Sequence, residues 1–283
     1  MDKPAGPTSH DVVHAARRAL AERRVGHAGT LDPPASGLLV VLAGRATRLA
    51  RFVGMLPKVY AGTLRFGWET STDDATGRVA GDLDHGWRDL DPAAIAAAFA
   101  QVQQQPLQVP PAVSAKKVDG ERAYRRVRRG EVPDLVGVPV LIHDWRLLEC
   151  DLDQGIVSFE VVCSSGTYVR AVARDVGRTL GTRAHLLALR RTAIGDWTVE
   201  DAAPLDALAP GRADTLLRPM AEAVQHLPAV ILPHAEAARL CQGQRIEAGG
   251  YASGAVAVFD ASGLIAVAES RAGVLHPEVV LVE

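Results

Sequence analysis

The pattern of apolar and polar positions predicts helices and strands that alternate along most of the chain. Apolar residues recur with helical spacing at 12–20 and in the alanine-rich stretch 92–102. Residues 60–67 instead alternate between apolar and polar, as a half-buried strand does, and the continuous apolar run at 37–43 is typical of a buried strand. Residues 155–163 predict a further strand. Helix and strand are therefore intermixed.

The stretch 168–180 has a clear two-sided pattern. Apolar residues stand at 169, 172, 173, 176 and 180, which is a helical period, and arginines occupy the other side. We expect a helix with one apolar face and one basic face.

The C-terminal part of the chain predicts a small, mostly β module. A closing helix at 216–227 and a linker near 227–230 precede it. The module should contain one short helix and then short strands separated by glycine-containing turns, at 234–241, 255–260, 264–269 and 279–283. Because folded domains commonly run to ~100–200 residues, the 283 residues suffice for two domains. We expect them at 1–227 and 228–283.

Composition describes an ordinary globular protein, with 48% hydrophobic and 23% charged residues. The three cysteines are far apart and lack the CxxC spacing of zinc or dithiol sites, which fits a reducing compartment. The N-terminus has no basic-then-apolar signal pattern, and apolar runs such as 38–43 fall short of the ~18 residues of a membrane span. We expect a cytoplasmic protein without membrane attachment.

Charge is concentrated in one segment. The formal net charge of -2 argues mildly against nucleic-acid binding, which depends on Lys and Arg neutralising phosphates. Residues 114–130, however, contain seven basic residues against two acidic ones, a local net charge of +5. An isolated charge run is more often a solvated face than a binding surface, so the run alone leaves both interpretations open.

The densest segment is GHAGTLDPPASGLL at 26–39, in which small residues and prolines surround a single carboxylate, Asp32. Glycines permit close approach or positive φ, and the two prolines restrict the backbone after Asp32. A rigidly held carboxylate before a buried strand is a candidate catalytic group. Asp-Pro is also a common start of a turn, so this segment alone supports a structural interpretation equally well.

GHAGTLDPPASGLL resembles the catalytic motif of the tRNA pseudouridine-55 synthase (TruB) family, whose pattern is close to G-H-x-G-x-L-D-P-x-A-x-G. Further segments resemble motifs of that family in the same order: DKPAGPTSHDVV at 2–13, KVYAGTLRFG at 58–67, TSTDDATG at 70–77, PPAVSAKKVDGERAY at 110–124, CSSGTYVRAVARDVG at 163–177 and HLLALRR at 185–191. The resemblance covers nearly the whole of 1–227. It implies an α+β fold with a mixed or antiparallel sheet, a thumb-like insertion at about 106–133 and a C-terminal PUA-like barrel.

The resemblance also assigns roles to individual residues. It implies that Asp32 is the catalytic aspartate, that Tyr60 stacks on the target base and that Arg170 pairs with Asp32. Tyr168 and Leu189 would line the pocket. His27 would fill the space that the uridine leaves in the RNA loop. The other substrate-binding positions that we expect are Lys3, Asp74, Lys116, Arg125, Arg126 and Arg129.

The reaction implied by the resemblance is the conversion of uridine 55, in the T-arm of tRNA, to pseudouridine. The N1–C1′ bond breaks, the uracil turns and C5 becomes attached to C1′, so the resemblance implies neither a cofactor nor a metal. Asp32 could attack C1′ or remove the 2′-proton, and the sequence does not choose between these routes. We expect a monomer that needs no obligatory protein partner.

Two positions depart from the family pattern. Ser71 stands where the family often has an acidic residue, and family members usually have a strand before the segment that begins here at Asp2. Either that strand is absent or the start codon lies upstream.

Three alternative functions remain to be compared. The chain could be a guide-RNA-dependent relative within a ribonucleoprotein, although the thumb-like insertion favours an enzyme that acts alone. It could be an RNA-binding or RNA-folding factor without catalysis, which the presence of Asp32, Tyr60 and Arg170 disfavours. Asp73 and Asp74 raise the idea of a metal-dependent nuclease, but no GxxxxGK[ST] loop or calcium-loop spacing accompanies them.

Overall fold

The computed structural model describes residues 1–114, 117–118, 121–123, 126, 129, 131, 134–250 and 252–282. Contacts divide the chain into two units, each built from segments that are distant in sequence. Unit 1 consists of Met1–Thr8, Leu31–Leu38 and Leu56–Ala202. Unit 2 consists of Ser9–Thr30, Leu39–Met55 and Ala203–Glu283.

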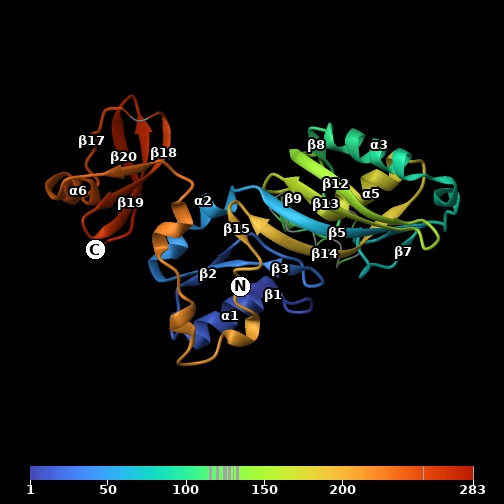
Figure 1. The fold of residues 1–283 in the computed structure, drawn as a ribbon, viewed down its shortest axis with the longest axis horizontal. Coiled ribbons are helices and arrows are strands. Elements are labelled where there is room, and N and C mark those ends of the chain that lie inside the picture. Colours follow the sequence, from blue (N-terminus) through green and yellow to red (C-terminus); the bar gives the residue numbers. More distant parts are fainter. Residues whose placement is uncertain are drawn as a thin grey trace. The chain divides into compact units, whose positions relative to one another are not determined.

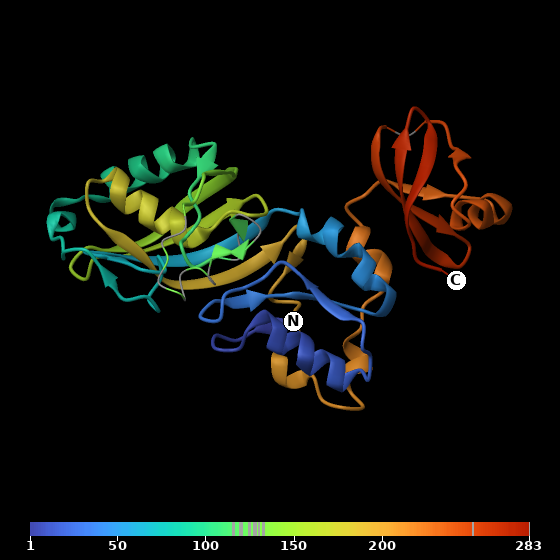
Figure 2. The ribbon, with the colours of Figure 1, turned by 180° about the vertical axis from the view of Figure 1, so that it is seen from behind.

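Unit 1 is built around one mixed, mainly antiparallel sheet (Figures 1 and 2). Its strands lie in the order β1-β3-β14-β5-β13-β12, with β15 paired to the end of β14. Their bounds are Asp2–Lys3 for β1, Ser36–Leu38 for β3, Ala184–Ile194 for β14, Lys58–Phe66 for β5, Ile156–Cys163 for β13, Ile142–Asp151 for β12 and Trp197–Thr198 for β15. The β3–β14 pair is parallel, whereas the other pairs are antiparallel.

Strand β5 illustrates why the sheet buries one face. Every second residue from Lys58 to Phe66 is buried and the residues between them are half-buried, which is the alternation predicted from the sequence. Gly62 is required within this row, because a Cβ there would lie 2.6 Å from the ring of Phe159 on β13. The buried residues of β5 and β13 belong to the main hydrophobic core of the unit.

Two helices, α3 (Pro92–Gln103) and α5 (Val169–Thr179), pack against each other and lie on the same face of this sheet (Figures 1 and 2). The Asp91 side chain caps α3 by accepting a hydrogen bond from the Ala94 amide at 2.7 Å, and Pro92 occupies the first turn. Both predicted helices are confirmed. The basic face of α5 is not wholly at the surface, however, because Arg170 and Arg174 are only 6% and 5% exposed.

The predicted strand at 37–43 is divided at Leu39. Its first part belongs to β3, and its second part is β4 (Val40–Ala43), which pairs with β2 (Val25–Ala28) in unit 2. Strands β12 and β14 were not predicted, although β14 is bonded on both sides within the sheet.

Short elements complete unit 1. They are the 3-10 helix Gly86–Asp89 and the paired strands β6 (Glu69–Thr70) with β7 (Val79–Ala80), β8 (Leu107–Gln108) with β11 (Val138–Pro139), and β9 (Lys117–Val118) with β10 (Glu121–Arg122). The β8–β11 pair joins the two ends of the segment that contains most of the predicted insertion.

Unit 2 begins with α1 (Ser9–Ala19), the β2–β4 ribbon, a 3-10 helix at Gly44–Leu49 and α2 (Ala50–Gly54). The apolar side of α1 packs on the ribbon through Val13 and Ala16 against Val25. The predicted helix at 216–227 is wrong. Two 3-10 helices, Ala213–Leu216 and Met220–Val224, occupy this region, and Pro219 stands between them, where an α-helical interior would be disrupted.

The C-terminal part of unit 2 is a sheet in the order β16-β18-β19-β20-β17, with α6 packed on it. The bounds are Ala229–Ile231 for β16, His234–Cys241 for α6, Ile246–Glu247 for β17, Gly254–Asp260 for β18, Gly263–Arg271 for β19 and Val274–Val280 for β20. The predicted short helix is confirmed, whereas the last strand begins and ends earlier than expected. Within this unit, Arg45 and Arg48 donate to the carbonyls of Leu281 and Val280.

No helix of the described residues is both long enough and apolar enough to cross a membrane.

Candidate active site

The loop that carries Asp32 is held by the N-terminal segment of unit 1. The Lys3 side chain is fully buried, and its ammonium donates to the carbonyls of Pro4 and Pro7, each at 2.8 Å, and of Pro33 at 3.3 Å. The Gly6 amide also donates to the Pro33 carbonyl, at 2.8 Å. Lys3 was predicted to bind substrate, but the structure places its charge beneath the loop, where it supports the residue next to Asp32.

The strand after the loop is pressed against β14. Gly37 has φ +105°, and a Cβ there would lie 2.2 Å from the carbonyl oxygen of Arg191. Any other residue would be strained and would push β3 away from β14. Gly37 therefore determines how closely the strand following Asp32 approaches the sheet.

Arg170, in the first turn of α5, faces this loop. Its Nε lies 3.0 Å from Asp32 Oδ2, and one terminal nitrogen lies 3.7 Å from Asp74 Oδ2. The guanidinium also donates to the carbonyl of Thr72 at 2.8 Å and to that of Val113 at 3.1 Å. These contacts fix the plane of the guanidinium, so that its Nε–H points at Asp32.

Asp74 is held by the turn in which it lies. Its Oδ1 accepts hydrogen bonds from the Thr72 hydroxyl at 2.7 Å, the Thr76 amide at 2.9 Å and the Thr76 hydroxyl at 2.5 Å. The other oxygen, Oδ2, faces Arg170. Backbone bonding joins this turn to Leu186 of β14. Asp74 is therefore a buried carboxylate at this site, hydrogen-bonded through Oδ1 and facing Arg170 with Oδ2.

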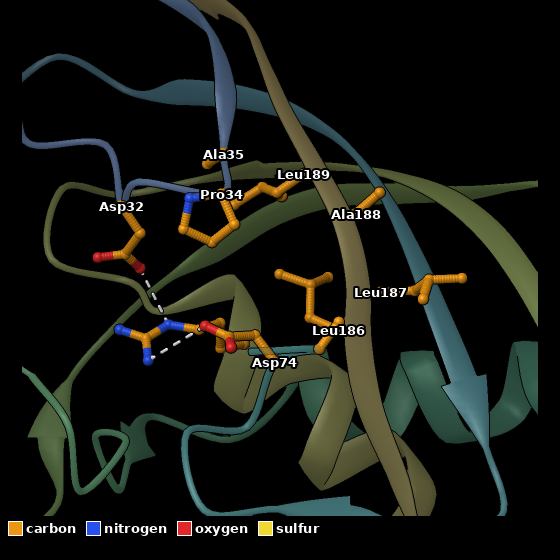
Figure 3. A pocket seen from close by; sticks show the side chains of 10 residues that line it. Asp32, Pro34, Ala35, Asp74, Leu186, Leu187, Ala188 and Leu189 are labelled. Carbon is orange, nitrogen blue, oxygen red and sulfur yellow. Dashed lines mark ion pairs between the residues drawn. The ribbon is translucent and has the colours of Figure 1, made fainter. Parts of the chain in front are cut away.

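A pocket open to solvent lies in front of these charges (Figure 3). Asp32, Asp74 and Arg170 form its polar wall. Opposite them β14 contributes four consecutive residues, Leu186, Leu187, Ala188 and Leu189, and a register shift between β14 and β5 occurs at Leu187. Such bulges are frequent beside active sites because they redirect side chains. A flat apolar ring with polar edges, such as a nucleobase, would meet both kinds of wall.

Tyr60 stands on β5 directly across from Arg191 on β14. It is 9% exposed and is not one of the residues that line the pocket. The Arg191 guanidinium is fully buried, lies 6.0 Å from the ring centre and donates from Nε to the Leu38 carbonyl at 2.7 Å. Burial raises the pKa of Tyr60, and the nearby charge of Arg191 partly opposes this rise. Arg191 thus connects Tyr60 to the strand that follows the Asp32 loop.

The remaining predicted residues lie in several places. Leu189 lines the pocket, and Tyr168 is half-buried immediately before α5, with its amide donating to Gln108 Oε1 at 2.8 Å. His27 is in unit 2, half-exposed on β2 and paired with Val41.

The predicted basic contacts are only partly described. Lys116 and Arg125 lie outside the described residues. Arg126 Nε lies 3.1 Å from Glu131, and Arg129 contacts both Glu121, at 2.6 Å, and Glu131, at 2.8 Å.

Sequence reasoning missed Arg191 and the β14 residues Leu186 to Ala188. They lie within a motif that resembles the family, but a strand with arginines in two successive positions does not show which arginine is buried. The alternation of β5 indicates that Tyr60 faces the core, but it does not give the register that places Arg191 across from it. In the part of the chain that the structure describes, no group of three or more His, Cys, Asp or Glu side chains could hold a metal ion.

Comparison with known proteins is consistent with this geometry. Residues 17–169 match the model of the TruB family pseudouridylate synthase N terminal domain, and residues 228–281 match the C-terminal domain of Pseudouridine synthase II TruB. The chain belongs to the TruB family of pseudouridylate synthases. The family predicted from the sequence motifs is therefore confirmed.

Relatives in the TruB family align over almost the full chain. The tRNA pseudouridine synthase B of Thermobifida fusca is 47% identical over 290 residues, which cover 99% of this chain and 96% of the relative. That of Corynebacterium efficiens is 42% identical and covers 96% of this chain and 91% of the relative.

Solved structures show the same fold. A chain in the structure of an H/ACA RNP bound to a substrate RNA containing 2′-deoxyuridine has a TM-score of 0.73 at 22% identity and covers 100% of this chain and 84% of its own length. A chain of a Cbf5-Nop10-Gar1 complex has a TM-score of 0.73 at 24% identity, with 99% and 83% covered. The predicted α+β pseudouridine synthase fold is confirmed, and the C-terminal sheet is consistent with a PUA-like domain.

Proposed function

We propose that this TruB-family enzyme converts uridine 55, in the T-loop of tRNA, to pseudouridine, with Asp32 as the catalytic carboxylate. The observation that carries the proposal is the Asp32–Arg170 pair. A carboxylate whose side chain is 43% exposed stands at the mouth of the pocket, 3.0 Å from a guanidinium that is 7% exposed. The charge that must react is accessible, whereas the charge that orients it is buried. Relatives named tRNA pseudouridine synthase B, at 42–47% identity, support the same substrate class.

The reaction needs one carboxylate in a fixed orientation. The N1–C1′ bond of the uridine breaks, the uracil turns within the pocket, and C5 bonds to C1′; C5 then loses its proton and N1 gains one, so the product is an isomer of the substrate. Asp32 either attacks C1′ or removes the proton from C2′, and Arg170 holds the carboxylate for either step. The detached uracil carries its charge on carbonyl oxygens and must not leave. The apolar wall of β14, including Leu189, would confine the base between the two steps.

The target base has to leave the RNA stack before it can reach Asp32. Extrusion of a base costs a few kcal/mol, and stacking on an aromatic ring returns ~1–3 kcal/mol per base. Tyr60 is proposed to supply this stacking surface, and Tyr168 is proposed to line the pocket. His27 is proposed to occupy the space that the base leaves in the T-loop.

The phosphates are proposed to meet the basic segment that contains Lys116, Arg125, Arg126 and Arg129. Arg126 holds an ion pair with Glu131, and Arg129 holds ion pairs with Glu121 and Glu131; these side chains are 28–51% exposed. Exposed ion pairs are worth only ~0.2–1 kcal/mol, so phosphates can displace them at small cost.

The chain is proposed to consist of a catalytic domain at 1–227 and a second domain at 228–283. The sheet of the second domain is proposed to bind further RNA backbone. Since the substrate is tRNA, we expect the enzyme to work in the cytoplasm, as a monomer and without an obligatory protein partner.

The test is to incubate the purified protein with an unmodified tRNA transcript and to map pseudouridine at single-nucleotide resolution. Modification at position 55 alone, without added protein or guide RNA, is the expected result. A requirement for a guide RNA would favour the ribonucleoprotein alternative. Tight tRNA binding without pseudouridine at any position would favour a folding factor and would overturn the proposal.

A further inference from the structure

A second buried ion pair lies one helical turn along α5 from the proposed catalytic pair. Arg174 follows Arg170 by four residues, which places both side chains on the same side of the helix. One terminal nitrogen of Arg174 lies 2.7 Å from Asp73 Oδ2, and its Nε lies 2.8 Å from Asp175 Oδ1. The Arg174 and Asp73 side chains are 7% and 12% exposed. The pair is therefore shielded from water almost as well as Arg170.

The partners of the two arginines are adjacent as well. Asp73 and Asp74 are consecutive, and each faces a different arginine: Asp74 faces Arg170, and Asp73 faces Arg174. Asp73 adopts φ +59°, a conformation that is uncommon for residues other than glycine and that persists where surrounding contacts enforce it. This conformation points two neighbouring carboxylates at two neighbouring arginines.

The backbone of the Asp73 turn is tied to the pocket. The Asp73 carbonyl accepts from the Leu186 amide at 3.0 Å, and the Ala75 amide donates to the Leu186 carbonyl at 2.9 Å. Leu186 lines the pocket together with Asp74. A displacement of Asp73 would therefore move both the carboxylate that faces Arg170 and a residue of the apolar wall.

The two arginines also hold one segment in common. Arg174 donates to the carbonyl of Val109 at 2.8 Å, and Arg170 donates to that of Val113 at 3.1 Å. Pro110 and Pro111 lie between these positions, and their fixed φ angles make the segment stiff. The start of the predicted insertion is thus fastened to α5 at two points, by the same two side chains that hold the aspartates.

We propose that Arg174 and Asp73 are positioning residues for the reaction: they set the turn that presents Asp74 to Arg170, and through Arg170 they set the orientation of Asp32. The inference rests on the proposed function for its kinetic test only. Neither side chain lines the pocket, so neither is proposed to touch the RNA.

The same helix offers a matched control. Arg178 follows Arg174 by four residues and binds Glu69 through two nitrogens, at 2.6 and 2.7 Å, but its side chain is 57% exposed. Arg178→Met removes an arginine–carboxylate pair of comparable geometry from the same helix. The Arg178 side chain is largely exposed, and its partner Glu69, 14% exposed, precedes the turn at 70–77, so the single-turnover rate of this variant should stay within about twofold of the parent rate.

The experiment measures the single-turnover rate of pseudouridine formation with saturating enzyme, well below the thermal midpoint of each variant. Arg174→Met should lower this rate about 10–100-fold, since misplacement of a catalytic group by about 1 Å has an effect of that size. Arg174→Lys keeps the charge but not the planar fork, and it should recover only part of the rate. A parent-like rate in Arg174→Met would overturn the proposal.

Two double variants distinguish a role in positioning the catalytic groups from a role in stability alone. Asp73→Asn/Arg174→Met removes both charges of the Asp73–Arg174 pair, and the Asp175 carboxylate that remains is 17% exposed, so the thermal midpoint should be higher than that of Arg174→Met while the rate stays low. A rate that recovers together with the midpoint would overturn the proposal. Asp74→Asn/Arg174→Met should be little slower than Asp74→Asn alone, because both changes disturb the same contact between Asp74 and Arg170. If the rate losses of Asp74→Asn and Arg174→Met instead multiply in the double variant, the proposal is overturned. Should Arg174→Met fail to fold, Arg174→Lys and the two double variants decide the matter.

Hydrogen–deuterium exchange tests the positioning independently of activity. Exchange over 70–77 and 109–114 should be faster in Arg174→Met than in the parent, and unchanged in Arg178→Met. This outcome would stand even if the parent made no pseudouridine, in which case the proposed function alone would fail. Unchanged exchange in both variants would contradict the positioning role.

Discussion

Arg170 Nε lies 3.0 Å from Asp32 Oδ2, and the two side chains differ sharply in exposure. The guanidinium is buried and bonded to the carbonyls of Thr72 and Val113, so it cannot turn to follow the carboxylate. Asp32, at the open end of the pair, is the group that can reach a substrate. The orientation of the Asp32 carboxylate is therefore determined by the packing of α5 and the two segments bonded to Arg170.

Asp32→Asn should abolish turnover while leaving tRNA affinity within a few fold of the parent value. The change keeps the shape of the side chain and removes only its charge and basicity. The single-turnover rate should fall at least about 100-fold, which corresponds to ~2.7 kcal/mol in the barrier. Retention of more than about one per cent of the parent rate would show that another group carries the reaction. Affinity is to be measured by filter binding on the same tRNA.

Arg170→Lys should lower the single-turnover rate strongly although the positive charge remains. A lysine ammonium cannot bond Asp32 and the carbonyls of Thr72 and Val113 with the geometry of a planar fork. We expect a loss of about 10–100-fold, again as the effect of a misplaced carboxylate. Arg190→Lys is the matched control, because Arg190 binds Asp2 bidentately on β14 and is partly exposed. An equal loss in both variants would show that the Arg170 effect is not specific.

Tyr60→Leu and Tyr60→Phe separate stacking from the hydroxyl group. Leucine removes the aromatic face, and loss of ~1–3 kcal/mol of stacking predicts a rate about 10–100-fold lower at saturating enzyme. Phenylalanine keeps the ring and loses only the group that interacts with Arg191, so it should retain more activity than leucine. Equal rates in the two variants would argue against a stacking role for the ring.

Arg126→Ala/Arg129→Ala should weaken tRNA binding most at low salt. If each arginine meets one phosphate, the slope of log affinity against log salt should shrink by roughly 0.7–0.9 for each phosphate that is no longer neutralised. Glu131→Gln should act in the opposite direction, because Glu131 holds both arginines in the free protein. An unchanged affinity and slope in the double variant would mean that this part of the basic segment is only a solvated face.

Lys58 should make the stability of the protein depend on pH in the alkaline range. Burial, aided by the charge of Arg191, lowers the pKa of Lys58 from 10.5 to about 8. Between these values the unfolded chain binds a proton that the folded protein has released, so the free energy of unfolding should rise with pH. Lys58→Met should remove this rise. At 1.36 kcal/mol per pKa unit, the parent-minus-variant difference in unfolding free energy should grow by about 2–3 kcal/mol between about pH 8 and about pH 10. Urea titrations at the two pH values measure it, and a difference that does not change with pH would refute the burial of this charge.

Much of the fold, and the carboxylate proposed to react, could be predicted from the sequence. Alternation along β5 and helical spacing along α5 are local patterns, and each is produced by one element facing one core. Asp32 was singled out because its segment resembles the catalytic motif of the TruB family, since the local pattern of glycines and prolines alone fits a structural turn equally well. Its partner Arg170 was predicted from a resembling motif, not from any local pattern.

What only the tertiary structure decided is which charges are buried and which groups they meet. Strand β14 escaped prediction because register shifts at Leu187 and Thr192 interrupt its alternation, and its arginines obscure the apolar pattern. The same is true of Arg174 and Arg191, which read as surface residues in sequence and are 5% and 1% exposed in the fold. The spacing of apolar residues in a sequence indicates which residues share one face of a helix or strand. Whether that face is apolar or polar usually predicts whether it is buried or exposed. Prediction of burial from polarity fails where a buried guanidinium is paired with a carboxylate or a carbonyl that is distant in sequence. Only the folded chain brings those groups together.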